Sequence, residues 1–394
     1  PPTDNPVATF YCGPEGHPAW TSRLRWTNVI NMSAYPRGKT DFEKFELARD
    51  ALAAQGGGVL YYPAGAYDFT AMPAEGPNGR GLMLKRGVVI RGEAPAGHPL
   101  ASKAGALDLP TKFIFGFRKE NGGESPRDWN LIGLCPEGDQ GVKDVNDVGI
   151  CWVHCVGATI YFGPQVNWGK TWATAGSWKS KEARDAWAGR VPDGTFPMDP
   201  FMGGGTQYVG AGDGRLVFGC VLQDAAPTNR YRNRAGHTER FASRMGVYGS
   251  RVLIANCVLP KSTRNYLYNG VMFDYGNTCA IDVNKFLLGL VREDGKCPGY
   301  FHQGVVVRDN WVYNHGHWGY NVSGHWVSLL GNHNERDYLR SGDDVYGLGG
   351  AWKLTANGVT LVSDVYDNLS RAFDLAGKCL WVDGNSFNST GSYP

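Results

Sequence analysis

Residues 41–67 constrain the fold of this chain more than any other segment. The first half of the segment carries an apolar stripe at helical spacing, made of Phe42, Phe45, Ala48 and Leu52. Arg49 alone interrupts the stripe, and Asp41 stands where an N-cap residue is expected. We therefore predict a short amphipathic helix over residues 41–55.

A strand and a sharp turn follow the predicted helix. Glycines 56–58 end the helix, residues 59–62 form a short β-rich run, and residues 63–65 turn the chain away. One amphipathic helix that leads into one strand is what a solenoid needs at its N-terminal end, because the first coil would otherwise expose its core to water. The segment therefore predicts the capped start of a solenoid.

Six residues of the segment match a Gly-Gly-x-Val-x-x-Pro-x-Gly-x-Tyr pattern: Gly57, Gly58, Leu60, Pro63, Gly65 and Tyr67. In this pattern the chain resembles the pectin lyase-like superfamily. The resemblance implies an all-β fold, a right-handed parallel β-helix with a short N-terminal capping helix and long loop insertions. It does not imply a particular reaction, because one fold serves many functions.

Five later segments share a hydrophobic strand that runs into a polar turn residue. These turn residues are Asn256, Asn310, Asn332, Asp364 and Asn385, at intervals of 54, 22, 32 and 21 residues. A repeated unit with loops of variable length is typical of a solenoid, and stacked amides can hydrogen-bond from coil to coil. A β-sandwich with Asn-rich turns is the alternative, but it would not explain the cap.

The organisation that we predict is one elongated β-helix domain over residues 1–394. Residues 148–163 have the pattern of a pair of strands, and residues 160–214 form a Trp-rich loop insertion that includes Trp168 and Trp172. Tryptophan rings suit the face of a sugar, although they also suit packing of the insertion onto the coils. The 39 basic and 37 acidic side chains nearly balance, which argues against a nucleic-acid partner.

The sequence also carries hints about cellular location. No apolar stretch is long enough to span a bilayer, and the chain begins at Pro1 without an initiator methionine, so we expect a processed, secreted or extracellular protein, with the cell surface or periplasm as variants. Nine cysteines fit an oxidising compartment, but an odd number leaves at least one thiol unpaired. Cys220 and Cys257 occupy similar places in successive repeats, where they either pair or stack as free thiols in the core.

Candidate catalytic residues concentrate between residues 302 and 344, which hold five of the nine histidines. His315 and His317 are two residues apart and would share a strand face, where a neutral imidazole can act as a base or bind a metal. Asp343 and Asp344 are adjacent in a glycine-flanked turn, where mutual repulsion can separate their pKa values into one acid and one base. An exposed acidic turn or a calcium-binding loop is the alternative for this pair.

The Gly-Asp-Asp and histidine turns resemble those of β-helical glycosidases of the polygalacturonase type, although the histidine turn comes first here. The resemblance implies hydrolysis, with Asp343, Asp344 and His317 as the catalytic residues. We expect Trp168, Trp172, Trp318 and Arg340 to bind the substrate. A lyase would instead need a base beside an acidic sugar, for which His317, Tyr320, Arg340 and Lys353 have the right chemistry.

We therefore predict an enzyme that cleaves glycosidic bonds in a polysaccharide, with hydrolysis preferred over elimination. No metal site and no cofactor is predicted, and calcium is the one ion that the sequence allows. The alternative is a non-enzymatic structural or adhesive β-helix of a surface filament, layer or fibre, which would associate with copies of itself.

Overall fold

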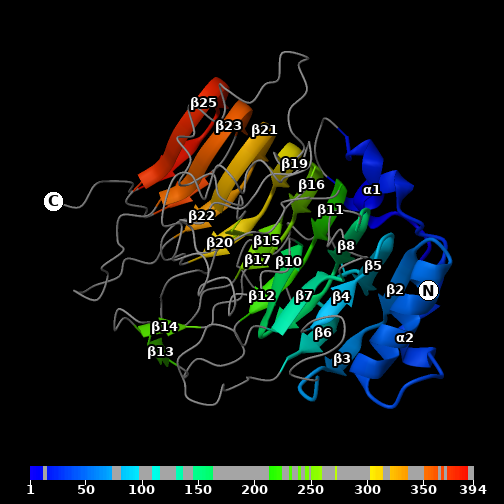
Figure 1. Cartoon of the computed structure of the whole chain (residues 1–394). Helices are drawn as coiled ribbons and strands as arrows, with labels where there is room; N and C mark the ends of the chain where they lie inside the picture. The colour runs from blue at the N-terminus through cyan, green and yellow to red at the C-terminus, as the bar shows by residue number, and fades with distance from the viewer. Residues whose placement is uncertain are drawn as a thin grey trace, which may run out of the picture.

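The computed structural model describes residues 1–11, 16–72, 81–96, 109–115, 130–135, 145–162, 213–223, 230–232, 238–240, 245–247, 250–259, 271–272, 302–313, 320–335, 350–362, 365–367 and 371–388. Three ladders of parallel strands run along the molecule (Figure 1). We call them sheets I, II and III.

Sheet I begins with β1 (Val29–Asn31), β2 (Gly58–Tyr62), β5 (Val88–Gly92), β8 (Val148–Cys151), β11 (Asp213–Phe218), β16 (Ser250–Ala255) and β19 (His302–Arg308). Sheet II consists of β3 (Gly65–Asp68), β6 (Thr111–Ile114), β9 (His154–Val156), β12 (Val221–Gln223), β17 (Val258–Leu259), β20 (Trp311–Tyr313), β22 (His333–Glu335), β24 (Val365–Asp367) and β26 (Ser386–Asn388). Sheet III begins with β4 (Leu82–Leu84), β7 (Asn130–Leu134), β10 (Ala158–Phe162), β15 (Met245–Val247) and β18 (Val271–Met272).

Three long strands join sheets III and I: β21 (Tyr320–Leu330), β23 (Gly350–Val362) and β25 (Arg371–Asp383). The start of β21 pairs with β18 and its end pairs with β19, so the strand passes from sheet III into sheet I. A separate antiparallel hairpin consists of β13 (Arg230–Arg232) and β14 (Thr238–Arg240).

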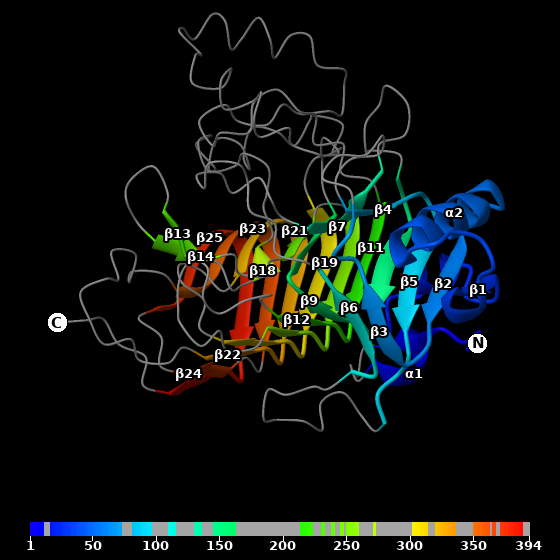
Figure 2. The ribbon, with the colours of Figure 1, turned by 90° about the horizontal axis from the view of Figure 1, so that it is seen from below.

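The chain visits the three sheets in a fixed rotation, III then I then II. Strands β7, β8 and β9 make one coil, and β10, β11 and β12 stack on it with the same parallel pairing. Figure 2 shows the strand colours advancing from blue to red along the axis. The fold is therefore the right-handed parallel β-helix that the sequence predicts, with the handedness usual for parallel crossovers.

Residues 148–163, which we expected to form a pair of strands, contain three. Their strands β8, β9 and β10 belong to three different sheets. Trp152, Val153 and Gly157 supply the bends between them. The prediction of two strands was wrong because neighbours in sequence pair with the coils before and after them and not with each other.

A continuous apolar core fills the coils. On sheet I the residues of alternate positions, such as Val148 and Ile150, are fully buried and join one cluster with residues of the other two sheets. The alternation follows from the period of two in a strand, and the β-branched side chains suit stacked strands. The core therefore extends along the axis rather than around one centre.

Helix α2 (Asp41–Ala54) covers the N-terminal end of this core. Its residue Thr40, and not Asp41 as predicted, is the N-cap, and Thr40 and Glu43 form a reciprocal capping box. Arg49, the interruption of the apolar stripe, is buried because its guanidinium donates to the Met83 carbonyl at 3.0 Å and its Nε donates to Asp50 at 2.8 Å. Its Nη2 lies 3.6 Å from the Glu46 carboxylate, so the charge is paired although this nitrogen makes no hydrogen bond.

The first turn residue between sheets I and II has a left-handed backbone in coil after coil. From β8 onward its φ lies between 51° and 66° wherever the structure describes it, at Trp152, Gly219, Asn256, Asp309, Gly331 and Gly384. Glycine, Asn and Asp tolerate this conformation best, which explains their frequency in the turn. Trp152 is the exception.

The second turn residue forms the internal ladder. The Asn310 Nδ2 donates to Asn332 Oδ1 at 3.0 Å, and Asn310 Oδ1 accepts from the Cys257 backbone N–H at 2.9 Å. Asn256 therefore does not belong to the amide stack, because it occupies the first turn position and Cys257 the second. The prediction that Asn256 belongs to the same turn position as Asn310 was wrong by one residue. Asn is favoured at both turn positions, for different reasons, so the sequence alone does not distinguish them.

Of the two alternatives left open for Cys220 and Cys257, the structure shows the stack of free thiols. Both are buried at consecutive second turn positions, and Val258 N–H donates to the Cys220 carbonyl between the two coils at 2.9 Å. Among the described residues, five cysteines are free and buried: Cys135, Cys151, Cys155, Cys220 and Cys257. Burial raises the pKa of the Cys151, Cys155 and Cys257 thiols, which keeps them protonated and unreactive.

Candidate functional site

The predicted site residues fall in connections outside the described residues. These are Trp168, Trp172, His317, Trp318, Arg340, Asp343 and Asp344. The strands at the ends of those connections are described, however, and they fix where each connection leaves and rejoins the β-helix. The site is therefore built from these strands.

The outer surface of sheet I is closed over its first coils. The N-terminal segment, residues 1–11 and 16–26 with α1 (Pro6–Phe10) and the 3-10 turn η1 (Ala19–Arg23), packs there. A second apolar cluster unites its side chains with those of the strands beneath, including Trp20 and Trp26 above and Leu216 and Phe218 below. This part of sheet I is thus unavailable to a large ligand.

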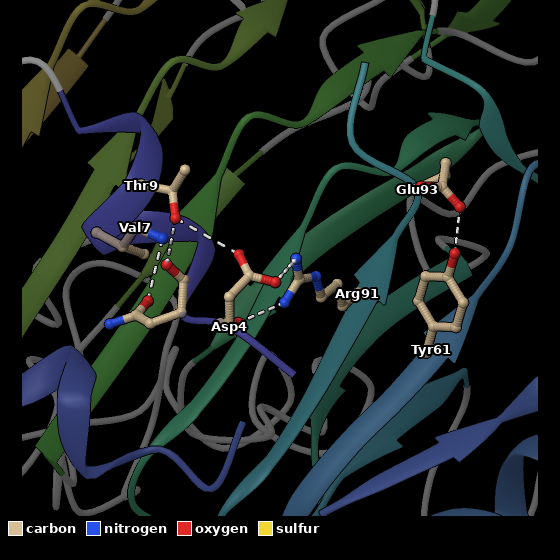
Figure 3. Close-up of polar contacts among 7 residues, drawn as sticks. Asp4, Val7, Thr9, Tyr61, Arg91 and Glu93 are labelled. Carbon is tan, nitrogen blue, oxygen red and sulfur yellow. Dashed lines mark hydrogen bonds and ion pairs between the residues drawn. The ribbon is translucent and has the colours of Figure 1, made fainter. Parts of the chain in front are cut away.

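Ionic contacts hold the N-terminal segment at its start (Figure 3). Arg91, on β5, is almost fully buried and donates from Nη2 to the Asp4 carboxylate at 3.0 Å and from Nη1 to the Asp4 carbonyl at 2.5 Å. Beside this pair the Tyr61 hydroxyl donates to Glu93. Burial first, and the Glu93 carboxylate second, raise the pKa of Tyr61, so its phenol stays protonated and cannot act as a base.

Further contacts hold the rest of the segment. Phe10 packs edge-on against Trp152, with ring centroids 5.2 Å apart, and Tyr11 stacks 5.5 Å from the Arg308 guanidinium on β19. The Arg23 guanidinium pairs with Asp147 at 2.8 Å. The segment thus reaches from β5 to β19, and its contacts are structural.

Sheet III differs from sheet I because long connections border it on both sides. From β8 onward, the connections from sheet I to sheet II have two residues each. In contrast, β20 ends at Tyr313 and β21 begins at Tyr320, and β22 ends at Glu335 and β23 begins at Gly350. Loops held by a rigid scaffold are the usual carriers of function, so sheet III is the candidate site face.

The strand order brings two of the predicted catalytic segments to the same edge. Residues 314–319 and 336–349 both connect sheet II to sheet III, in consecutive coils. Residues 163–212, between β10 and β11, leave instead from the opposite edge, where sheet III leads to sheet I. The predicted catalytic and tryptophan segments therefore flank one sheet from its two sides.

A row of polar residues runs from strand to strand along sheet III, parallel to these two edges. Asn321 pairs in register with Lys353, and Lys353 pairs with Asp374, on β21, β23 and β25. The neighbouring row runs from buried Ile160 and Met245 through Val271 to Tyr320. Since strand residues alternate between faces, the row of Lys353 occupies the outer face.

The same register corrects one candidate base. Tyr320 continues the core row, next to Val271 and Trp352. It is therefore placed on the core face of sheet III, which is unsuitable for a base that must meet a substrate. Lys353 keeps its candidacy, because it stands in the alternate row.

A buried cation lies where the 163–212 connection rejoins the coils. Arg215 on β11 is fully buried and stands in register with Val148 and Val252. Burial lowers its pKa to about 9, and the nearby Asp147 carboxylate opposes that shift. A charge in the core register marks this corner as polar, unlike the apolar coils on either side.

Sequence analysis missed one exposed aromatic residue. Trp381 on β25 is 64% exposed, in the outer row of sheet I that also contains Ser328 and Thr360. The N-terminal segment covers the earlier residues of that row, such as Leu253. The alternation of residues 380–383 is the signal that places Trp381 on the outer face, but it can be interpreted only once the last coil is aligned with its neighbours.

In the described part of the chain, no three His, Cys, Asp or Glu side chains are grouped to hold a metal ion. The helices within those ranges include none that is both long and apolar enough to cross a membrane.

Comparison with solved structures finds matches at low sequence identity. The A-module of mannuronan C-5 epimerase AlgE6 from Azotobacter vinelandii is 13% identical, with 93% of this chain and 99% of that chain covered and a TM-score of 0.24. For PfbA, a surface adhesin of Streptococcus pneumoniae, the identity is 12%, coverage is 93% of each chain and the TM-score is 0.33. For ORF18 of Geobacillus virus E2 the identity is 10%, coverage is 92% of this chain and 60% of that chain, and the TM-score is 0.29.

No protein-family model and no curated protein matches the sequence. Likenesses as weak as these carry no argument about activity. The assignment of the β-helix accordingly rests on the strand register of the chain itself.

Proposed function

We propose that the chain is an extracellular enzyme that cleaves glycosidic bonds in a polysaccharide, by hydrolysis, on the outer face of sheet III. The observation that carries the proposal is the strand order, by which residues 314–319 and 336–349 leave the same edge in consecutive coils. Segments so anchored can bring an imidazole and two carboxylates to one substrate. Asp343 and Asp344 serve as acid and base, and His317 assists them.

The substrate-binding roles follow from the same two edges of sheet III. Trp318 and Arg340 belong to the two connections at the catalytic edge and hold the sugar there. Trp168 and Trp172 belong to the 163–212 connection, whose ends are anchored at β10 and β11 on the opposite edge. A polysaccharide bound between the two edges would lie on sheet III, in contact with consecutive coils.

The test is a panel of purified polysaccharides with two readouts, release of reducing ends and absorbance of unsaturated products. Hydrolysis gives reducing ends alone, and elimination gives both. We expect Asp343→Asn or Asp344→Asn to lower the rate by roughly 10²–10⁴-fold, the usual contribution of a general acid or base. His317→Ala should lower it by less.

Asp383→Asn is the matched control, because Asp383 is exposed on sheet I, away from the proposed site. It should retain the parent rate. Full activity of both Asp343→Asn and Asp344→Asn on a substrate that the parent cleaves would remove these residues from the mechanism. If the parent protein released unsaturated product, the reaction would be elimination and not hydrolysis.

A second candidate, a structural or adhesive protein that self-associates, is favoured by the surface of β25. Val382 stands in the core row with buried Leu329, yet it is 44% exposed, and its neighbour Trp381 is 64% exposed. Sedimentation over a range of concentrations tests this candidate. Two results together would favour the structural protein over the enzyme. The particle should grow with concentration unless Val382 is changed to Asp, and no polysaccharide of the panel should give a product.

A further inference from the structure

We propose that the β25 end of the solenoid binds the same end of a second copy of this chain, so that two molecules form a closed dimer with two-fold symmetry. The two copies of β25 pair antiparallel in this dimer. The inference goes beyond the proposed function and does not depend on it, because no residue of the proposed catalytic segments takes part. It also differs from the fibre of the second candidate, since the assembly ends at two copies.

The apolar core is open at the β25 end. The core-face row of sheet I is fully buried in successive coils, at Ile90, Ile150, Val217, Ile254, Val307 and Leu329. The same row ends on β25 at Val382, which is 44% exposed. Within the described ranges, Val382 and its neighbour Trp381 are the exposed large hydrophobic side chains. Adjacent exposed apolar residues at the end of a solenoid indicate a contact surface.

The backbone of β25 offers a second feature of a contact surface, an open strand edge. The strand has 13 residues and pairs with β23, and no other strand in the described part of the chain pairs with it. Edge strands are usually short, or interrupted by proline or a bulge, because a long row of unpaired N–H and C=O groups recruits another strand. β25 contains no proline. Its edge is therefore suited to a strand from another molecule.

The opposite end of the stack is closed, which limits the choice of partner. Figure 1 shows α2 and β25 at opposite ends of the stacked strands. Phe45 and Leu52 of α2 are fully buried in the core cluster, so a second copy cannot add its first coil to β25. The surface of a second copy that has the same exposed row and the same open edge is its own β25. Contact between two identical surfaces gives a two-fold interface that closes at two copies.

The charges of β25 suit antiparallel pairing with a second copy. They alternate in sign along the strand, in the order Arg371, Asp374, Lys378 and Asp383. An antiparallel partner presents this order in reverse, so the start of one strand, at Arg371, lies beside the end of the other, at Asp383. Opposite charges on neighbouring strands stabilise their pairing. The order of charges thus favours a second copy over an unrelated strand.

Sedimentation velocity of the full chain over about 1–100 μM provides the test, because that range brackets micromolar affinities. The parent should pass from one chain to a particle with twice the 43.0 kDa of one chain, and should stop there. Val382→Asp should raise the dissociation constant about tenfold or more, since it puts a charge into the apolar contact. Amide hydrogens of β25 should exchange more slowly at high protein concentration.

Ala66→Asp is the matched control, because Ala66 is an exposed strand residue on β3, at the closed end of the stack. It should dimerise as the parent does. Arg371→Asp should weaken the dimer, and adding Asp383→Arg should restore most of the loss, because the exchanged charges again oppose each other. Circular dichroism checks that each variant folds, and Trp381→Ser replaces Val382→Asp if the latter does not fold.

Three results would overturn the proposal. A parent that stays a monomer at every concentration would show that no second copy binds, and would point to another segment of this chain as the cover of β25. Growth beyond two copies would replace the closed dimer by open assembly. Equal losses in Ala66→Asp and Val382→Asp, or no recovery in the charge-exchanged double variant, would exclude antiparallel pairing of β25 as the cause.

Discussion

At the scale of single residues, the turn between sheets I and II determines how one coil stacks on the next. Its first residue must adopt a left-handed backbone, and its second must place a side chain over the preceding coil. Asn310 satisfies donors and acceptors in both neighbouring coils: Cys257 N–H and the Ile254 carbonyl on one side, and Asn332 on the other. One amide therefore connects three coils.

Asn310→Ala should lower the free energy of unfolding by about 3 kcal/mol, because buried groups left without a partner cost about 1–3 kcal/mol each. Denaturant unfolding measures the loss. The control is Asn385→Ala in the last described coil, where the amide donates to the Asp383 carbonyl at a partly exposed site. A cost of less than about 1 kcal/mol is expected there, and equal costs at both positions would contradict the buried ladder.

Gly219→Ala should destabilise the chain by about 3 kcal/mol, through backbone strain and overpacking together. The φ of Gly219 is 63°, and a Cβ at that position would lie 2.2 Å from the Trp152 ring. Gly16→Ala separates the two causes, because φ there is 78° but no atom lies within 4 Å of the added carbon. If both variants lost the same stability, the contact with Trp152 would play no part.

At the scale of elements, the two N-terminal structures cover different surfaces. Helix α2 covers the end of the core, and the N-terminal segment covers the outside of sheet I. The apolar stripe predicted the helix, because its period needs no information from the rest of the chain. Nothing in the spacing of Trp20 or Trp26 predicted the second cover, since the strand residues that share their cluster are spread along the chain from Val59 to Val258.

Thr40→Ala should cost about 1 kcal/mol of stability, because the capping box at the start of α2 would lose its hydroxyl acceptor. Thermal or denaturant unfolding measures the change. Thr40→Ser keeps the hydroxyl and should recover most of the loss. No difference between the two variants would mean that the cap does not stabilise the solenoid end.

At the scale of the whole molecule, the stacked coils bury thiols along the axis. The chain has nine cysteines, of which five are free and buried in the described residues, so at most four should react in the native protein. The raised pKa of Cys151, Cys155 and Cys257 keeps these thiols protonated at pH 8, where an ordinary thiol begins to ionise. Fast labelling of more than four thiols in the native state would contradict this packing.

Denaturation should make those five thiols reactive together. Labelling with iodoacetamide at increasing denaturant, followed by mass spectrometry of peptides, would show whether they appear in one transition. Gradual exposure from one end would instead indicate that coils unfold separately, as nearest-neighbour solenoids can.

The sequence by itself determined that the chain coils, where the first coil begins and which residue types form the turns. These properties depend on local periodicity and on backbone preferences, which a short segment carries within it. Only the tertiary structure decided the register: that Asn256 lies outside the amide ladder, that residues 148–163 serve three sheets, and that Lys353 shares a row with Asn321 and Asp374. Register depends on pairing between coils separated by 21 to 85 residues, because connections of variable length hide the spacing from the sequence.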